Sequence, residues 1–119
     1  TQEGAQRITD GLAEAGIKGR GAALDVADAE AVDALIKDIA GNEGAVTILV
    51  NNAGITKDNL LLRMKPDEWD AVIETNLSAL NRTSRACLRV MMKALRGRII
   101  NIGSVVGQMG NPGQGNYCA

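Results

Sequence analysis

The sequence has 119 residues, of which 45% are hydrophobic and 23% are charged, and its net charge at pH 7 is -1. These values are typical of a globular α/β chain with one core at most. No segment concentrates Lys or Arg and no apolar run is long enough for a bilayer, so neither a nucleic acid nor a membrane is expected as a partner. There is no His and no CxxC pair, so we expect no metal site, and a cytoplasmic location is the default.

Helical periodicity occurs three times along the chain. Apolar residues recur at three- and four-residue steps over 3–15, over the segment that follows Asp28, and over 66–95. Asp28 can cap the second helix, because its carboxylate can accept the free N–H groups of a first turn. Pro66 suits the first turn of the third helix, where its missing N–H is not needed.

Three strands are predicted between and after these helices, at 19–26, 46–51 and 98–104. The second run is almost wholly apolar, which is typical of a parallel strand covered on both faces. Helices that alternate with strands predict an α/β fold, a partial Rossmann-like, doubly wound parallel sheet with helices on both faces. Because three such strands would leave apolar edges uncovered, we expect 1–119 to be the central part of a single dinucleotide-binding domain.

Small and polar residues follow the predicted strands, where open α/β sheets bind their ligands. Gly54 and Ala53 would let a ligand approach the backbone closely, and Asn52 could hold a ligand hydroxyl or the neighbouring turn. By spacing alone, a simple turn is the better interpretation of these residues. Asp25, with Val26 beside it, is equally weak evidence, since a capping or solvated aspartate is commoner than a ligand contact.

Asn76 interrupts the apolar stripe of the third helix, where an unpaired amide would cost roughly 1–3 kcal/mol. One interpretation is a core amide bonded to a nearby backbone group. The other is a kink or polar anchor that opens the helix toward a site. The pattern favours the two interpretations equally.

Ser104 and Tyr117 are thirteen residues apart and joined by a glycine-rich loop, so they could form a proton-transfer pair if the loop folds back. A tyrosine loses its proton near pH 10, and acid catalysis at neutral pH therefore needs a nearby cation. No Lys or Arg follows Arg98. Local residues alone favour a packing or surface role for Tyr117.

Three stretches, "ILVNNAGIT", "WDAVIETNL" and "GRIINIGSVVGQMGNPGQGNY", resemble the short-chain dehydrogenase/reductase family. The resemblance spans essentially the whole chain, and the last stretch is similar to members that reduce 3-oxoacyl thioesters on acyl carrier protein. It implies an NADPH-dependent reductase of fatty-acid biosynthesis whose substrate is a 3-oxoacyl-[acyl-carrier-protein]. It also implies a homotetramer with subunit contacts through the helix at 66–95.

The resemblance also assigns roles to individual residues. Tyr117 would donate a proton to the substrate carbonyl oxygen, and Ser104 would hydrogen-bond the same oxygen. Asn76 would help to order a water relay, and Gln114 would contact substrate. The implied cofactor-binding residues are Asp25 and Val26 beside the adenine, and Asn52, Ala53 and Gly54 along the ribose.

Two parts of the family pattern fall outside the sequence. The glycine-rich turn would precede Thr1, and the lysine expected four residues after Tyr117 would lie two positions beyond Ala119. We therefore expect Tyr117 to be the general acid of the parent enzyme and 1–119 alone to be inactive. The resemblance implies that the charges that select NADPH over NADH lie in the glycine-rich turn and at the end of the family's second strand, both outside this sequence.

Two alternatives stay open at the level of sequence. The first is another enzyme of the family, such as an acetoacetyl-CoA reductase or a different short-chain alcohol or ketone dehydrogenase. The second is a noncatalytic assembly module that pairs through the helix at 66–95.

Overall fold

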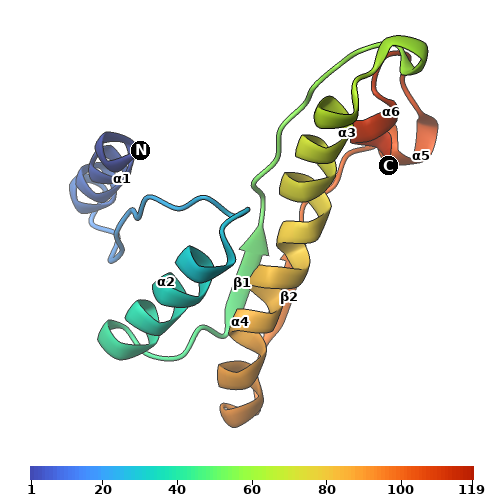
Figure 1. Ribbon diagram of the computed structural model, residues 1–119. Helices are drawn as coiled ribbons and strands as arrows, with labels where there is room; N and C mark the ends of the chain where they lie inside the picture. The colour runs from blue at the N-terminus through green and yellow to red at the C-terminus, as the bar shows by residue number, and fades with distance from the viewer.

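A computed structural model describes residues 1–119 as an α/β chain with four longer helices and a small parallel sheet, in which the first helix lies apart from the sheet (Figure 1). None of these helices is both long enough and apolar enough to span a membrane. The long elements are α1 (Gln2–Glu14), α2 (Ala29–Asn42), α3 (Pro66–Ile73), α4 (Ala79–Lys93), β1 (Ile48–Asn51) and β2 (Arg98–Asn101). The short ones are a 3-10 turn at Leu61–Arg63, a π turn at Glu74–Ser78, α5 (Val106–Met109) and α6 (Gly115–Cys118).

The first two helices begin at side-chain caps. The Thr1 hydroxyl accepts the N–H of Gly4 at 3.1 Å and starts α1. The Asp28 carboxylate accepts the N–H groups of Glu30 and Ala31, each at 3.0 Å, and starts α2. These bonds satisfy N–H groups that have no partner within the helix, so the predicted helix and its cap at Asp28 are confirmed.

The predicted helix at 66–95 is interrupted rather than continuous. Pro66 begins α3 as expected, but the π turn separates α3 from α4, and the regular helix ends at Lys93. In this turn the N–H of Ala79 bonds the carbonyl of Glu74, five residues back. Such an insertion widens the helix by one residue and changes the direction of the side chains beside it. Asn76 lies at its centre.

The sheet has two strands instead of the three that were predicted. β1 and β2 pair in parallel with Ile48 opposite Arg98 and Asn51 opposite Asn101. The segment at 19–26, predicted as a strand, connects α1 to α2 and pairs with no other segment (Figure 1). A strand needs a hydrogen-bonded neighbouring strand, and this segment pairs with neither β1 nor β2.

The expected cover on both faces of β1 is also incomplete. Ile48 and Val50 are 57% and 53% exposed, and only nine residues of the chain are buried. The radius of gyration is 16.5 Å, compared with about 13.5 Å for a compact domain of this length. The small core runs along α2, α3 and α4 and includes Val32, Val72 and Cys87. An apolar sheet surface is therefore left open.

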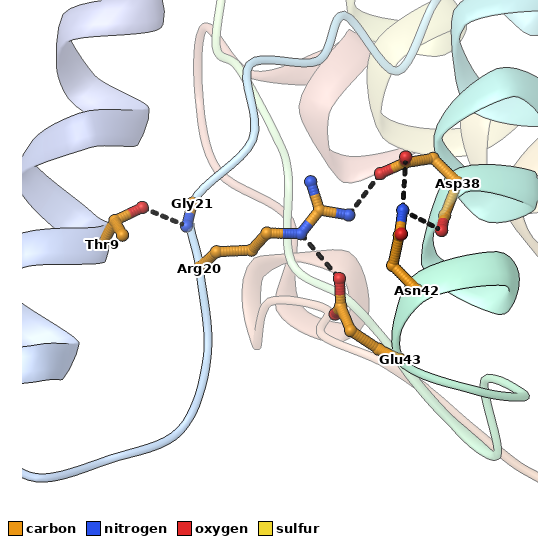
Figure 2. A network of polar contacts seen from close by, with 6 residues as sticks. All are labelled: Thr9, Arg20, Gly21, Asp38, Asn42 and Glu43. Carbon is orange, nitrogen blue, oxygen red and sulfur yellow. Dashed lines mark hydrogen bonds and ion pairs between the residues drawn. The ribbon is translucent and has the colours of Figure 1, made fainter.

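Polar contacts hold the segment after α1 in place (Figure 2). The Thr9 hydroxyl accepts the N–H of Gly21 at 2.9 Å. The guanidinium of Arg20 pairs with Asp38 of α2 and, at 2.6 Å, with Glu43 just after α2. The hydrogen bonds that Arg20 donates to Asp38 and Glu43 raise the pKa of Arg20 above its usual value. The route from α1 to α2 thus depends on polar contacts more than on buried apolar area.

Candidate active site

A cleft of about 720 Å³ opens where β1 and β2 end. Its walls are the backbone that follows β1, the π turn between α3 and α4, the segment that follows β2, and α6. The predicted site residues that line it together are Asn52, Ala53, Gly54, Asn76, Ser104 and Tyr117. This is the place where open α/β sheets bind ligands.

Asn76 lines the cleft and holds the backbone of Ile55 at both of its polar groups. The side-chain oxygen accepts the Ile55 N–H at 2.8 Å, and the side-chain nitrogen donates to the Ile55 carbonyl at 2.9 Å. Both interpretations of this residue are met, because its amide bonds a backbone group and also lies where the helix is interrupted. The clamp fixes the turn that begins at Asn52.

Ser104 and Tyr117 reach the cleft from different elements. Ser104 is exposed three residues beyond the end of β2, and its hydroxyl oxygen accepts the N–H of Val106 at 3.4 Å. Tyr117 is half-buried in α6, and its hydroxyl makes no hydrogen bond within the chain. The two hydroxyls are not bonded to each other, so each is available to a ligand in the cleft they share.

A polar ladder lies at the ends of the strands. The Thr83 hydroxyl of α4 donates to the side-chain oxygen of Asn51 at 2.7 Å, and the Asn51 nitrogen donates to the Asn101 side-chain oxygen at 2.9 Å. Thr83 and Asn51 are each 8% exposed. The ladder joins α4 to the ends of both strands. It therefore fixes the points from which the segments that carry Asn52 and Ser104 leave the sheet.

Two sequence-derived candidates, Asp25 and Val26, do not line the cleft. Val26 lines a neighbouring cavity of about 310 Å³ together with Asn52 and Ala53. Asp25 accepts the N–H of Ala27 at 2.9 Å, as in an ordinary turn. Arg82 of α4 forms an ion pair with Glu74 and donates to the Val26 carbonyl at 3.4 Å, so this segment is linked to the helix that carries Asn76.

Gln114 lies outside the cleft. Its side-chain nitrogen donates to Asp58 at 3.1 Å, and its oxygen accepts from Asn111 at 2.6 Å. Both ends of the amide are therefore occupied by loop residues. In this structure Gln114 closes a loop instead of facing the other site residues.

The loop before α3 is braced by Glu68. Its carboxylate accepts the Lys65 N–H at 2.8 Å and the Asn59 side-chain N–H at 3.2 Å. These bonds, the first being the larger cause, lower the pKa of Glu68 below its usual value.

Elsewhere, burial raises the pKa of the Cys87 thiol. No group of three or more His, Cys, Asp or Glu side chains is arranged to hold a metal ion.

Sequence reasoning missed Asn116 and Thr83. Asn116 precedes Tyr117, is 1% exposed and also lines the cleft. No spacing rule marks Asn116, since it lies in a short turn, and Thr83 has the polarity of many other residues of α4. A polar residue in register with Cys87 and Met91, which are both buried, was the only indication for Thr83.

One protein family has a sequence model that covers the whole chain. The sequence model of the short chain dehydrogenases matches residues 1–119. The chain belongs to the short chain dehydrogenase family. The family and the parallel two-stranded sheet with its helices are both consistent with the predicted α/β, partial Rossmann-like fold.

Similar short chain dehydrogenases include three bacterial proteins, each named 3-oxoacyl-[acyl-carrier-protein] reductase FabG. Those of Vibrio harveyi and Escherichia coli K12 are 56% and 54% identical over 119 residues, which are 100% of this chain and 48% of each relative. That of Pseudomonas aeruginosa is 56% identical over 116 residues, 98% of this chain and 47% of the relative. The chain thus spans about half the length of the curated relatives it matches.

Proposed function

We propose that residues 1–119 are the central part of an NADPH-dependent reductase that converts 3-oxoacyl-[acyl-carrier-protein] to the 3-hydroxyacyl product. One observation carries the proposal: Asn76, Ser104 and Tyr117 line a single cleft beyond the ends of two parallel strands. The similarity to reductases that bear this name supports the substrate class. The open apolar surface at Ile48 and Val50 supports a larger single domain, because further helices would cover this face of the sheet.

The residues at the end of β1 fit the ribose and nicotinamide side of a dinucleotide. Asn52, Ala53 and Gly54 present exposed backbone and small side chains to a cleft of about 720 Å³, within the usual range for small-molecule sites. We assign no residue of 1–119 to the pyrophosphate, because the glycine-rich turn of the family pattern would precede Thr1. In the proposed enzyme the bound NADPH would supply the hydride. Val26 and Asp25 would lie toward the adenine.

In this mechanism the chain's own residues handle the oxygen and its proton. Tyr117 donates its hydroxyl proton to the substrate carbonyl oxygen as that oxygen gains negative charge. Ser104 donates a hydrogen bond to the same oxygen and so stabilises the charge and orients the carbonyl. Asn76 keeps the turn after β1 in place through Ile55 and, with its helix opened at the π turn, can order a water on the route that returns a proton to Tyr117.

Two further parts of the proposal concern subunit assembly and substrate contact. Subunit pairing through the helix at 66–95, as in a homotetramer, would cover apolar side chains that are exposed on it, with Leu77 54%, Leu88 44% and Met92 71% exposed. A contact between substrate and Gln114 would require Gln114 to leave Asp58 and Asn111.

The decisive experiment uses the intact protein that contains this sequence. We expect NADPH oxidation with acetoacetyl-[acyl-carrier-protein] to exceed that with acetoacetyl-CoA, and NADPH to exceed NADH as reductant. Tyr117→Phe should lower kcat by a factor of about 100 or more, since it removes the proton donor. Ser84→Ala, which removes a hydroxyl from α4 away from the cleft, should leave kcat unchanged.

Other outcomes would change the assignment. Faster turnover of the CoA thioester would indicate an acetoacetyl-CoA reductase or a related dehydrogenase. Absence of turnover together with no change in NADPH fluorescence on titration would indicate a noncatalytic assembly module. Full activity of Tyr117→Phe would remove Tyr117 as the acid.

A further inference from the structure

Asn116 is a buried amide next to the proposed proton donor. It is 1% exposed, whereas Gly115 before it is exposed and Tyr117 after it is half-buried. The other side chains buried to the same degree, Val32, Val72 and Cys87, lack an amide. A polar group buried to this extent is costly unless each of its hydrogen-bonding atoms has a partner.

Every polar atom of this side chain has such a partner. Its nitrogen donates to the carbonyl of Lys57 at 2.9 Å and to the carbonyl of Glu68 at 3.1 Å, and its oxygen accepts the N–H of Tyr117 at 2.8 Å. Both amide protons are used, and they reach two separate elements. Lys57 follows the turn that Asn76 holds, and Glu68 belongs to α3.

The helix that carries Tyr117 is too short to fix its own position. α6 has four residues, and an isolated helix of that length is not stable. Its other ties to the loop before α3 lie at its N-terminal end, where Asn59 bonds the carbonyl of Gly113 at 2.8 Å and bridges Gln114. Within the turn that contains Tyr117, the Asn116 side chain makes the hydrogen bonds to the loop at Lys57 and to α3 at Glu68.

We propose that Asn116 is a positioning residue that sets the place of the Tyr117 hydroxyl in the cleft by tying α6 to the carbonyls of Lys57 and Glu68. The inference rests on the proposed role of Tyr117 as proton donor. Asn116 acts on the reaction only through Tyr117, so its loss should affect the chemical step more than cofactor binding. A purely structural role would lower stability and leave kcat at low temperature unchanged.

The test uses Asn116→Asp and Asn116→Ser in the intact protein. Aspartate keeps the shape but cannot donate to either carbonyl when ionised, and serine is too short to reach both. At temperatures well below each variant's Tm, we expect kcat for acetoacetyl-[acyl-carrier-protein] to fall by up to about 100-fold, the cost of a reacting group misplaced by about 1 Å. The KM for NADPH should stay within about twofold, since Asn116 is outside the residues assigned to the cofactor.

Cys87→Ala is the matched control, because it removes buried volume from α4 at a position that is 0% exposed and lines neither the cleft nor the cavity beside Val26. It should lower Tm without changing kcat. A crystal structure of each Asn116 variant gives a readout independent of turnover, in which the Tyr117 hydroxyl should be displaced relative to Ser104.

The outcomes separate this inference from the proposed function. If the wild-type protein reduces the thioester and both folded variants keep its kcat, Asn116 has no positioning role. If the wild type fails to reduce any 3-oxoacyl thioester, the proposed function is wrong, and the crystal structures alone decide whether Asn116 places Tyr117. An unmoved tyrosine in the variants would overturn the inference in either case.

Discussion

The side-chain amide of Asn76 makes two hydrogen bonds to the backbone of Ile55: its oxygen accepts the N–H at 2.8 Å and its nitrogen donates to the carbonyl at 2.9 Å. The two residues are 21 positions apart, and one belongs to an interrupted helix while the other follows the turn after β1. The cleft therefore has a wall whose shape depends on a single side chain. A regular helix through this region would direct the amide differently, so the π turn and the clamp belong together.

We predict that Asn76→Ala weakens this wall. Two hydrogen bonds are lost, at about 1 kcal/mol each, so the free energy of unfolding of the intact protein should fall by about 2 kcal/mol. The KM for NADPH should rise, because the turn at Asn52–Gly54 becomes less ordered. Urea denaturation and steady-state kinetics measure the two effects.

Asn76→Asp provides the control for that variant, because a carboxylate still accepts the Ile55 N–H but cannot donate to its carbonyl. It should retain part of the stability that alanine loses. Equal stability of wild type and Asn76→Ala would show that the clamp contributes nothing measurable.

The ladder from Thr83 to Asn51 and Asn101 should be sensitive to one hydroxyl. Thr83→Val keeps the volume and removes the donor to Asn51, which is 8% exposed. A buried group left without its partner costs about 1–3 kcal/mol, and we expect a loss of unfolding free energy in that range. Thr83→Ser, which keeps the hydroxyl, should lose less.

A double-mutant cycle identifies the ladder as the cause. With Asn51→Ala as the second change, the effect of Thr83→Val should shrink, because the partner is already absent. Strict additivity of the two changes would mean that Thr83 stabilises α4 by some other route.

The local rules that predicted the starts of α2 and α3 depend on short-range chemistry. Asp28 and Pro66 begin helices where their side chains suit a first turn, so the sequence is sufficient there. The segment at 19–26 has the composition of a strand but no neighbour, and pairing is a property that one segment does not carry. Composition therefore predicts a strand that the described chain does not form.

The site was only partly predictable for a related reason. Ser104 and Gly54 each follow a strand, and they lie near each other because the carboxyl ends of parallel strands meet at the same edge of the sheet. Asn116 and Thr83 matter through partners that are far away in sequence, 59 residues away for Lys57 and 32 for Asn51. No periodic pattern encodes such pairs. The helix interruption at Asn76 could be suspected from one polar residue, but its bond to Ile55 could not.

Gly21 allows α1 to approach the following segment, and Gly21→Ala should separate them. A Cβ atom at this position would lie 2.2 Å from the backbone oxygen of Ala5, which cannot move away without moving α1. Overpacking of this kind typically costs about 1–3 kcal/mol. We expect lower Tm and faster hydrogen exchange in α1 than in α4.

Gly11→Ala is the matched change within α1. Nothing lies within 4 Å of its added Cβ, and the residue is in the helix interior. Replacement of such a glycine should stabilise the helix by roughly 0.5–1 kcal/mol. If Gly21→Ala were as harmless as Gly11→Ala, the contact between α1 and Gly21 would not exist in solution.

Glu68 should make stability depend on pH. Its bonds to Lys65 and Asn59 lower its pKa from the usual 4.5, so the folded protein favours the carboxylate. The stabilisation is fully present above about pH 4.5 and is lost as the pH falls through the lower pKa of the folded state. Glu68→Gln cannot titrate, so the Tm difference from wild type should be largest near neutral pH and should shrink below pH 4.5.

Asp67→Asn controls for the loss of one negative charge at the start of α3, since the Asp67 carboxylate makes no side-chain hydrogen bond. Both residues lie in the first turn, where a negative charge interacts favourably with the helix dipole. The part of the pH dependence that is specific to Glu68 is the difference between the two variants. If both variants followed the same curve between pH 3 and 7, the bonds from Lys65 and Asn59 would have no thermodynamic effect, and the loop that Asn116 joins to α6 would need another brace.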